Sequence, residues 1–169
     1  MTRQMSYSQM TPSQTKARAL ALLLPAALLA GAWGSQLIGG LVPCEMCHWQ
    51  RWPHYAAVVA AALALVVPGR AVRLTLIAGA AALIAVSGLI GIFHAGVEYH
   101  WWQGITACST SVSGAGISTD EMLRRILAAP VVRCDAAQWK MFGISLAGYN
   151  AIFSLGGAAV IAWLIRRRA

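Results

Sequence analysis

Four cysteines and one arginine carry most of the chemistry that this chain could perform. Cys44 and Cys47 form a Cys-x-x-Cys pair, and Arg51 follows four residues after the second cysteine. Two sulfurs at this spacing can form a redox-active disulfide, hold a metal ion or tether a haem. The other two cysteines, Cys108 and Cys134, have 25 residues between them (109–133). Four cysteines allow three pairings, so the spacing alone leaves the connectivity open.

The composition of the chain places these cysteines beside a membrane. Of the 169 residues, 59% are hydrophobic and only 11% are charged, which is too little charge for the surface of a soluble domain. Long apolar runs account for the excess, and at about 1.5 Å per helical residue each can cross about 30 Å of hydrocarbon. We expect four membrane-spanning helices, at about residues 19–41, 47–67, 74–96 and 142–165.

The predicted fold class is all-α, because backbone groups in lipid must be satisfied within their own segment. Residues 16–168 are expected to form a single four-helix transmembrane bundle, and the polar residues 1–15 are expected to be disordered. The first run follows Lys16 and Arg18 in the manner of a signal peptide. It continues as far as Leu41, however, which favours a retained span.

The net charge of +8 would suggest a nucleic-acid partner in a soluble protein, but here its distribution predicts topology. All five acidic residues lie on the side of the cysteines. By the positive-inside rule, the opposite side, with both termini, is cytoplasmic. The cysteine loops then face the outside, which in a bacterium is the oxidising periplasm, where disulfides persist. Eight of the thirteen basic residues lie on the cytoplasmic side: Arg3, Lys16, Arg18, Arg70, Arg73, Arg166, Arg167 and Arg168.

The second outside loop, Trp101–Met141, contains a short amphipathic helix in our interpretation. Ser118–Glu121 fits a capping box, and Pro130 bounds the apolar pattern that follows it. A helix of this kind between two spans is expected to lie on the bilayer surface. The segment Ser109–Ser118 is rich in serine and glycine, so we expect it to be flexible.

Several polar residues near the cysteine side are candidates for a site. If Cys47 begins the second span, the helix N-terminus stabilises its thiolate, and Arg51 lies on the same helical face. An arginine at the end of a span is costly, which favours a functional role over contact with lipid phosphate. His94 and Glu98, four residues apart, could bind a head group or carry a proton, or could form only an interface hydrogen-bond pair.

Three further polar residues are weaker candidates. His48 follows Cys47 directly and His54 lies further along the same span. Asn150, within the fourth span, is expected to hold helices together rather than to touch a substrate.

Three alternatives to redox exchange remain for the cysteines. A zinc site would need two more ligands at close spacing, and we therefore predict no metal. A membrane-anchored c-type cytochrome is a more serious alternative, because Cys44–His48 reads Cys-x-x-Cys-His. A scaffold with purely structural disulfides is the third, although a Cys44–Cys47 disulfide would close almost no loop and would stabilise little.

The combined pattern resembles the disulfide bond formation protein B (DsbB) family. Pro-Cys-x-x-Cys-x-x-Gln-Arg follows a first span, and two loop cysteines flank a short amphipathic helix before a fourth span. The resemblance covers about Lys16–Arg168. It implies a quinone-dependent thiol oxidoreductase that reoxidises a periplasmic thioredoxin-fold protein resembling DsbA. Vitamin K epoxide reductase-like proteins do similar chemistry, but their quinone-proximal pair follows the loop cysteines, whereas here it comes first.

The same resemblance implies a role for each of the four cysteines and for Arg51. Cys44 pairs with Cys47, and Cys108 pairs with Cys134. The partner's thiolate attacks Cys108, and the released Cys134 attacks Cys44. The released Cys47 adds to the quinone, or forms a charge-transfer complex with it, while Arg51 stabilises both. Apart from the resemblance, the spacing of His94 and Glu98 makes them the remaining candidates for quinone contacts. Ubiquinone is favoured over menaquinone, although the sequence does not fix the choice.

Overall fold

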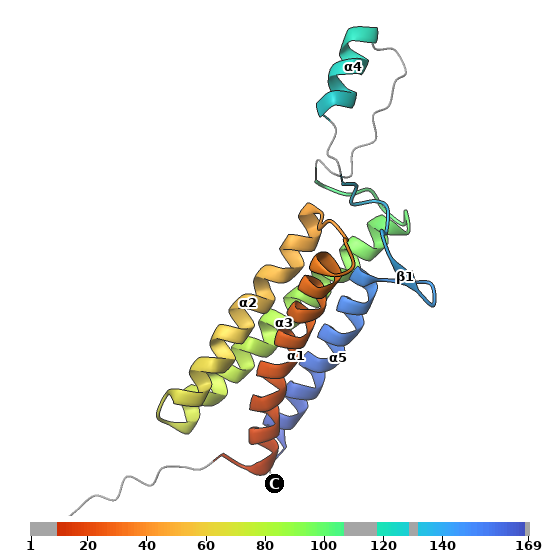
Figure 1. Cartoon of the computed structure of the whole chain (residues 1–169). Coiled ribbons are helices and arrows are strands. Elements are labelled where there is room, and N and C mark those ends of the chain that lie inside the picture. Colours follow the sequence, from red (N-terminus) through yellow and green to blue (C-terminus); the bar gives the residue numbers. More distant parts are fainter. Residues whose placement is uncertain (1–9, 107–117, 129–131, 168–169) are drawn as a thin grey trace, which may run out of the picture.

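Four long helices form the body of the protein (Figure 1). The computed structural model describes residues 10–106, 118–128 and 132–167. α2 and α5 each pack against both α1 and α3, so the four helices close into a bundle. This confirms the expected helical fold in the described part of the chain. The four helices are α1 (Pro12–Leu37), α2 (Glu45–Val66), α3 (Arg70–Glu98) and α5 (Leu146–Arg166).

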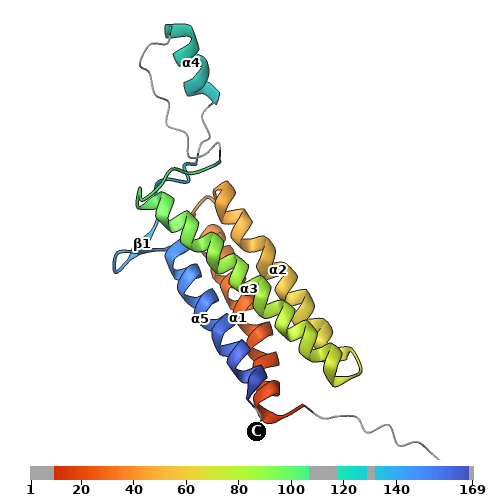
Figure 2. The same ribbon diagram turned by 180° about the vertical axis from the view of Figure 1, so that it is seen from behind.

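Three of these helices, α1, α3 and α5, are long and apolar enough to cross a membrane. α2 has 22 residues, but His48, Gln50, Arg51 and His54 make its first turns polar. The prediction of a fourth membrane span in α2 therefore stays a prediction. Both ends of the described chain lie at the same end of the bundle as the α2–α3 turn, and the start of α2 lies at the opposite end (Figures 1 and 2).

Local capping explains where α1 begins. The Thr11 side chain accepts a hydrogen bond from Gln14 N, the Gln14 side chain accepts one from Thr11 N, and Pro12 occupies the first turn. The expectation that residues 1–15 are disordered is therefore wrong for residues 12–15, which are helical. Residues 1–9 lie outside the described part of the chain.

A short hairpin precedes the last helix, where a helix starting at residue 142 was expected. β1 (Lys140–Met141) pairs with β2 (Ile144–Ser145) in an antiparallel register. Phe142 and Gly143 have φ of 50° and 78°, values that a right-handed helix does not contain. The helix begins only after this turn, where Ser145 accepts a hydrogen bond from Gly148 N.

The loop helix predicted from the capping box is present as α4 (Thr119–Ala128). It stands apart from the bundle, beyond the end at which α2 begins (Figures 1 and 2). Its position on a bilayer surface stays a prediction. The expected flexible segment lies outside the described residues except for Ser118.

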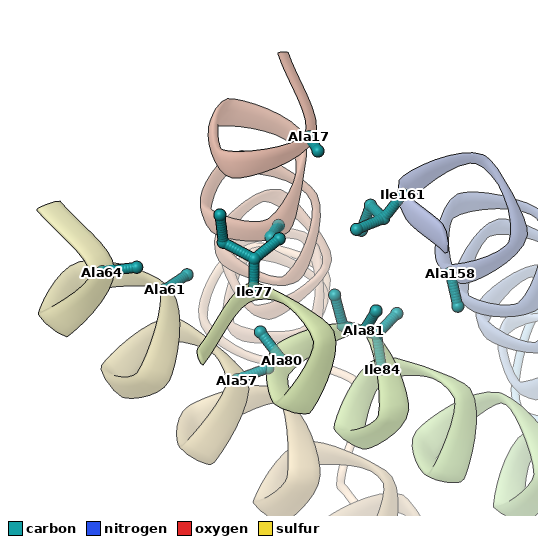
Figure 3. Close-up of a cluster of buried hydrophobic side chains, with 11 residues drawn as sticks. Ala17, Ala57, Ala61, Ala64, Ile77, Ala80, Ala81, Ile84, Ala158 and Ile161 are labelled. Atoms are coloured by element: carbon teal, nitrogen blue, oxygen red, sulfur yellow. The ribbon is translucent and has the colours of Figure 1, made fainter. Parts of the chain in front are cut away.

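Small side chains let the helices approach closely. Near the termini the core is made of alanine and isoleucine from all four long helices (Figure 3). Between α3 and α5, a Cβ added at Gly91 would lie 3.0 Å from Ala147 O and 3.1 Å from the Asn150 amide nitrogen. A glycine here is what allows α5 to bring Asn150 against α3.

Candidate functional site

The Cys-x-x-Cys pair caps the start of α2. Cys44 is the N-cap, and its Sγ accepts a hydrogen bond from Cys47 N at 3.2 Å. The helix begins at Glu45, two residues before the expected start, so Cys47 lies in its first turn. Both cysteines are free, with their sulfur atoms 2.7 Å apart. The hydrogen bond with the Cys47 thiol, together with burial, raises the pKa of Cys44.

The second outside loop brings Cys134 to the same place. Cys134 is disulfide-bonded and only 1% exposed. It packs in one buried cluster with Cys44, Met46 and Val97. Its expected partner, Cys108, lies outside the described residues, so the predicted pairing is not tested. The structure thus places the disulfide-bonded Cys134 in the same buried cluster as Cys44.

A reciprocal pair of hydrogen bonds ties the two loops together. Gln138 accepts from Val42 N at 3.0 Å and donates to Val42 O at 2.6 Å. This contact joins the segment before Cys44 to the segment after Cys134.

His94 faces the cysteines with a defined tautomer. Gln50 Nε2 donates to the backbone oxygen of Met46, which identifies it as the amide nitrogen, and it lies 2.7 Å from His94 Nδ1. Nδ1 must therefore accept, and the proton of the neutral ring is on Nε2. Nε2 lies 3.5 Å from Cys44 Sγ and 3.7 Å from Glu98 Oε1. His94 can donate a hydrogen bond to the sulfur.

Among the described residues, Arg51 is held by α1 and not by an acidic side chain. Its Nη1 donates to Gln36 Oε1 at 2.9 Å and its Nη2 to Ala32 O at 3.3 Å. The guanidinium also lies 5.5 Å from the centre of the Trp33 ring. These contacts keep a buried cation, only 8% exposed, in a fixed position. Because its partners are neutral, the positive charge remains available to an anion.

One cavity of about 280 Å³ connects these groups. Five predicted site residues line it: Cys44, Cys47, Arg51, His94 and Glu98. Most of the remaining wall is apolar and comes from α1 and α5, including Leu28, Leu29 and Phe153. An apolar cavity with a few convergent polar groups is typical of a site for a small flat ligand. A quinone ring fits this donor set, because it offers apolar faces and oxygen atoms that carry negative charge when reduced.

Sequence reasoning undervalued the interior polar residues. Gln50 belongs to the Gln-Arg motif, but the sequence pattern assigns it no role, and His54 is only a weak candidate from sequence. Both are buried and line the cavity. The available signal was helical spacing, because residues 47, 50, 51 and 54 fall on one face of α2. His48, in contrast, is exposed and does not line the cavity.

The geometry does not suit a tetrahedral zinc ion. The ligand atoms of Cys44, Cys47 and His94 lie within 4.8 Å of one another, which groups three candidate metal ligands. Two thiolates that each bind zinc at about 2.3 Å would be about 3.8 Å apart. The two sulfurs here are closer, at 2.7 Å, so they would have to move apart to bind zinc, and the absence of a metal stays a prediction.

Comparison with known families supports the same interpretation. A family model described as “Disulfide bond formation protein DsbB” matches residues 14–164. The chain belongs to the DsbB family. Together with three helices apolar enough to span a bilayer, this identifies a membrane oxidoreductase of disulfide bond formation.

Individual relatives agree with this assignment. The chain is 30% identical over 159 residues to “Disulfide bond formation protein B” of a Polaromonas species, covering 89% of this chain and 92% of that protein. It is 29% identical over 147 residues to the protein of the same name from Marinobacter nauticus, covering 79% and 81%. An uncharacterized protein of Rickettsia prowazekii, RP370, is 23% identical over 128 residues, covering 75% and 73%. No solved structure was found to match.

The DsbB assignment also bears on the cytochrome alternative. No comparison supports it, and the histidine that would complete its haem motif, His48, is exposed and does not line the cavity that the two cysteines line.

Proposed function

We propose that this protein reoxidises a DsbA-like periplasmic protein and passes the electrons to a membrane quinone. The observation that carries the proposal is the position of the Cys44–Cys47 pair. On one side it packs in a buried cluster with the disulfide-bonded Cys134, and on the other it lines an apolar cavity with Arg51. The pair therefore lies between a source of electrons and a site for an acceptor.

The proposed path starts at the loop disulfide. Because Cys134 is buried, a partner thiolate reaches the loop disulfide at Cys108, forms a mixed disulfide there and releases the Cys134 thiolate. The second partner thiolate then displaces Cys108 and leaves the partner oxidised. Two electrons now reside on the loop cysteines.

The next exchange moves these electrons to the membrane. The Cys134 thiolate attacks Cys44 of an oxidised Cys44–Cys47 pair, forms a disulfide with it and releases the Cys47 thiolate. Cys108 then displaces Cys44 from Cys134, which restores the loop disulfide and leaves Cys44 and Cys47 reduced. The His94 N–H, 3.5 Å from Cys44 Sγ, stabilises negative charge on that sulfur as it leaves.

Four residues would hold the quinone: Cys47, Arg51, His94 and Glu98. A bound quinone supplies an acceptor for two electrons and two protons. Arg51 provides a fixed positive charge where negative charge develops, at no cost of reorganisation because α1 already holds it. The apolar wall excludes water, which strengthens this interaction.

Redox energetics support an acceptor of this kind. A DsbA-like oxidant has a potential near −120 mV, and a glutathione pool near −220 mV lies about 100 mV below it. Reoxidation by that pool would be about 4.6 kcal/mol uphill for two electrons. A membrane-soluble quinone, ubiquinone in our proposal, is sufficiently oxidising and has direct access to a cavity between membrane helices.

The same proposal includes the orientation of the chain. The described basic residues Lys16, Arg18, Arg70, Arg73 and Arg166 lie toward the end of the bundle opposite the start of α2. This supports an inner-membrane protein with cytoplasmic termini and periplasmic cysteine loops.

A reconstituted reaction tests the function. The purified chain is mixed with a reduced thioredoxin-fold partner and ubiquinone, and the quinone absorbance is followed. We expect one quinone consumed per partner disulfide, loss of this reaction in Cys47→Ser, and full activity in the control His48→Gln. Absence of quinone reduction, or reduction that survives Cys47→Ser, would contradict the proposal.

A further inference from the structure

Two buried side-chain atoms in the described part of the chain have no hydrogen-bond partner: His54 Nδ1 and Glu98 Oε2. Both residues line the cavity described above. Glu98 can donate or accept through Oε2, depending on its protonation, so it does not define a ligand. His54 is different, because its neighbours fix which of its ring nitrogens carries the proton.

The amide group of Asn150 has a defined orientation. Its Nδ2 lies 3.2 Å from Ser87 O, a backbone carbonyl that can only accept, and 2.8 Å from Gln50 Oε1. Gln50 Oε1 is itself identified as the oxygen, because Gln50 Nε2 donates to Met46 O. Asn150 therefore presents its amide nitrogen toward Ser87 and Gln50, and its oxygen toward His54.

The tautomer of His54 follows from this orientation. Its Nε2 lies 3.0 Å from Asn150 Oδ1 and 2.9 Å from Ser87 Oγ. The Ser87 hydroxyl proton is directed to Gln50 O at 2.8 Å, so Ser87 Oγ accepts from His54. Ser154 Oγ, 3.4 Å from Nε2, directs its own proton to Asn150 Oδ1 at 3.0 Å, so it also accepts from His54. Since all three neighbours accept, Nε2 carries the proton and the neutral ring presents a lone pair at Nδ1.

A buried lone pair of this kind favours a ligand that can donate a hydrogen bond to it. His54 is only 3% exposed, so bulk water does not satisfy Nδ1. An oxidised quinone has only carbonyl acceptors, whereas its reduced form, the quinol, has two hydroxyl donors. We propose that His54 Nδ1 accepts a hydrogen bond from a hydroxyl of the quinol, so that the cavity binds the quinol more tightly than the quinone. The inference rests on the proposed quinone-dependent function.

This preference has a consequence for electron transfer. A buried acceptor that gains a neutral donor favours the liganded state by about tenfold. Tighter binding of the reduced form by tenfold raises the potential of a bound two-electron couple by about 30 mV. His54 would therefore make the bound quinone a stronger oxidant, which suits a protein that must regenerate an already strong oxidant.

The test measures binding and not turnover. The full-length protein with Cys44 and Cys47 both replaced by serine cannot transfer electrons. It is titrated in nanodiscs with a short-chain ubiquinone and, separately, with the corresponding quinol, by quenching of tryptophan fluorescence. In this background we expect the quinol to bind about tenfold more tightly than the quinone.

Two variants test the two ring nitrogens of His54 separately. His54→Gln keeps a donor near the Nε2 position and loses the Nδ1 acceptor, so the preference for quinol falls about tenfold while quinone affinity changes little. His54→Asn keeps an acceptor near Nδ1 and retains the preference. His48→Gln, an exposed histidine of the same helix, serves as the control. A second measurement needs no variant: the NMR signal of isotope-labelled His54 Nδ1 shifts on addition of quinol but not of quinone.

The outcomes distinguish failure of the role of His54 from failure of the proposed quinone-dependent function. If both ligands bind with a ratio that His54→Gln does not change, or if quinol leaves the Nδ1 signal unchanged, the role of His54 is refuted and the quinone site stands. If neither ligand binds, in this background or in the protein with its cysteines intact, the proposed function is refuted with it.

Discussion

The two ends of the bundle are built from the same four helices but are filled differently. Toward the termini, all eleven buried residues of one cluster are alanine or isoleucine, and we call this the alanine end (Figure 3). Toward the start of α2, which we call the cysteine end, the interior is polar. Gln50, His54, Ser87, His94 and Asn150 form a continuous hydrogen-bonded network there, beside a cavity.

This difference shows how a bundle of membrane helices can contain a polar site and remain stable. Small residues at the alanine end let the helices pack closely without polar groups, which stabilises the fold. The polar groups at the cysteine end are tolerated because neighbouring helices satisfy almost all of them. We therefore expect changes at the alanine end to affect stability and changes at the cysteine end to affect reactivity.

The largest effect is expected at the cysteine end, in Cys44→Ser. Removal of a nucleophile or of its disulfide partner typically costs more than about a thousandfold in turnover, and we expect a loss of this size in quinone reduction. The unfolding midpoint should change little, because serine is a good N-cap and keeps the hydrogen bond from Cys47 N. Quinone absorbance and thermal unfolding measure the two effects. A large loss of stability would mean that the pair has a structural role.

The opposite result is expected at the alanine end, in Ala80→Leu. Ala80 is fully buried, and added volume in a closely packed core costs about 1–3 kcal/mol. The activity per folded molecule should be unchanged. Gly79→Leu is the matched control, because Gly79 is exposed and nothing lies within 4 Å of the position of its Cβ. Equal destabilisation by both variants would show that the alanine cluster is not specially packed.

An intermediate effect is expected where α1 positions Arg51. Gln36→Ala removes the acceptor of Nη1, and a lost hydrogen bond to a charged group costs about 1.5–3 kcal/mol. We expect the KM for quinone to rise by roughly tenfold or more, with a smaller change in the exchange between Cys134 and Cys44. Ser35→Ala is the control, since Ser35 lines the same cavity without a hydrogen bond to Arg51. An unchanged KM would show that Arg51 does not need this support.

The two ends also differ in how well sequence alone predicts them. Apolar runs predicted the four long helices, because helix formation in lipid depends on composition that can be counted along the chain. Their boundaries were less predictable. α1 begins at Pro12 because of a capping box, and α5 begins after residue 142 because Phe142 and Gly143 adopt left-handed conformations. Both features depend on single residues rather than on average hydropathy.

The site was predictable where chemistry is specific to a residue type. Cysteines and a lone arginine near a span end are rare enough to attract attention, and five of the predicted residues do line one cavity. The roles of Gln50 and His54 were not predictable, because they depend on contacts with α3 and α5 from residues more than 30 positions away. Asn150 was expected to hold helices together, and its bonds to Gln50 and Ser87 agree with this.

The smallest effect is expected in the loop at the cysteine end, where Arg133 and Asp135 flank the disulfide-bonded Cys134. Arg133 donates to both carboxylate oxygens of Asp135, at 2.8 Å and 2.5 Å, and this contact holds the pKa of Asp135 below its usual range. A carboxyl group with a lowered pKa contributes its full stabilisation at pH values above its ordinary pKa of about 3.9. This stabilisation is lost as the pH falls through the lowered pKa. Exposed pairs contribute little, so Asp135→Asn should speed reduction of the Cys134 disulfide by a phosphine only about twofold at neutral pH.

The pH dependence distinguishes this pair from a general loosening of the loop. Reduction of the unmodified protein should accelerate toward the rate of Asp135→Asn as the pH falls below about 4, because protonation removes the same interaction. Asp135→Asn should lack this acid-dependent acceleration. At neutral pH, Arg133→Ala should be reduced at the same rate as Asp135→Asn, since either change breaks the same ion pair. Different rates in these two variants would show that one of the side chains acts independently of the other. In that case, the resistance of the Cys134 disulfide to reduction would depend on its buried packing against Cys44 and Met46, and not on the ion pair beside it.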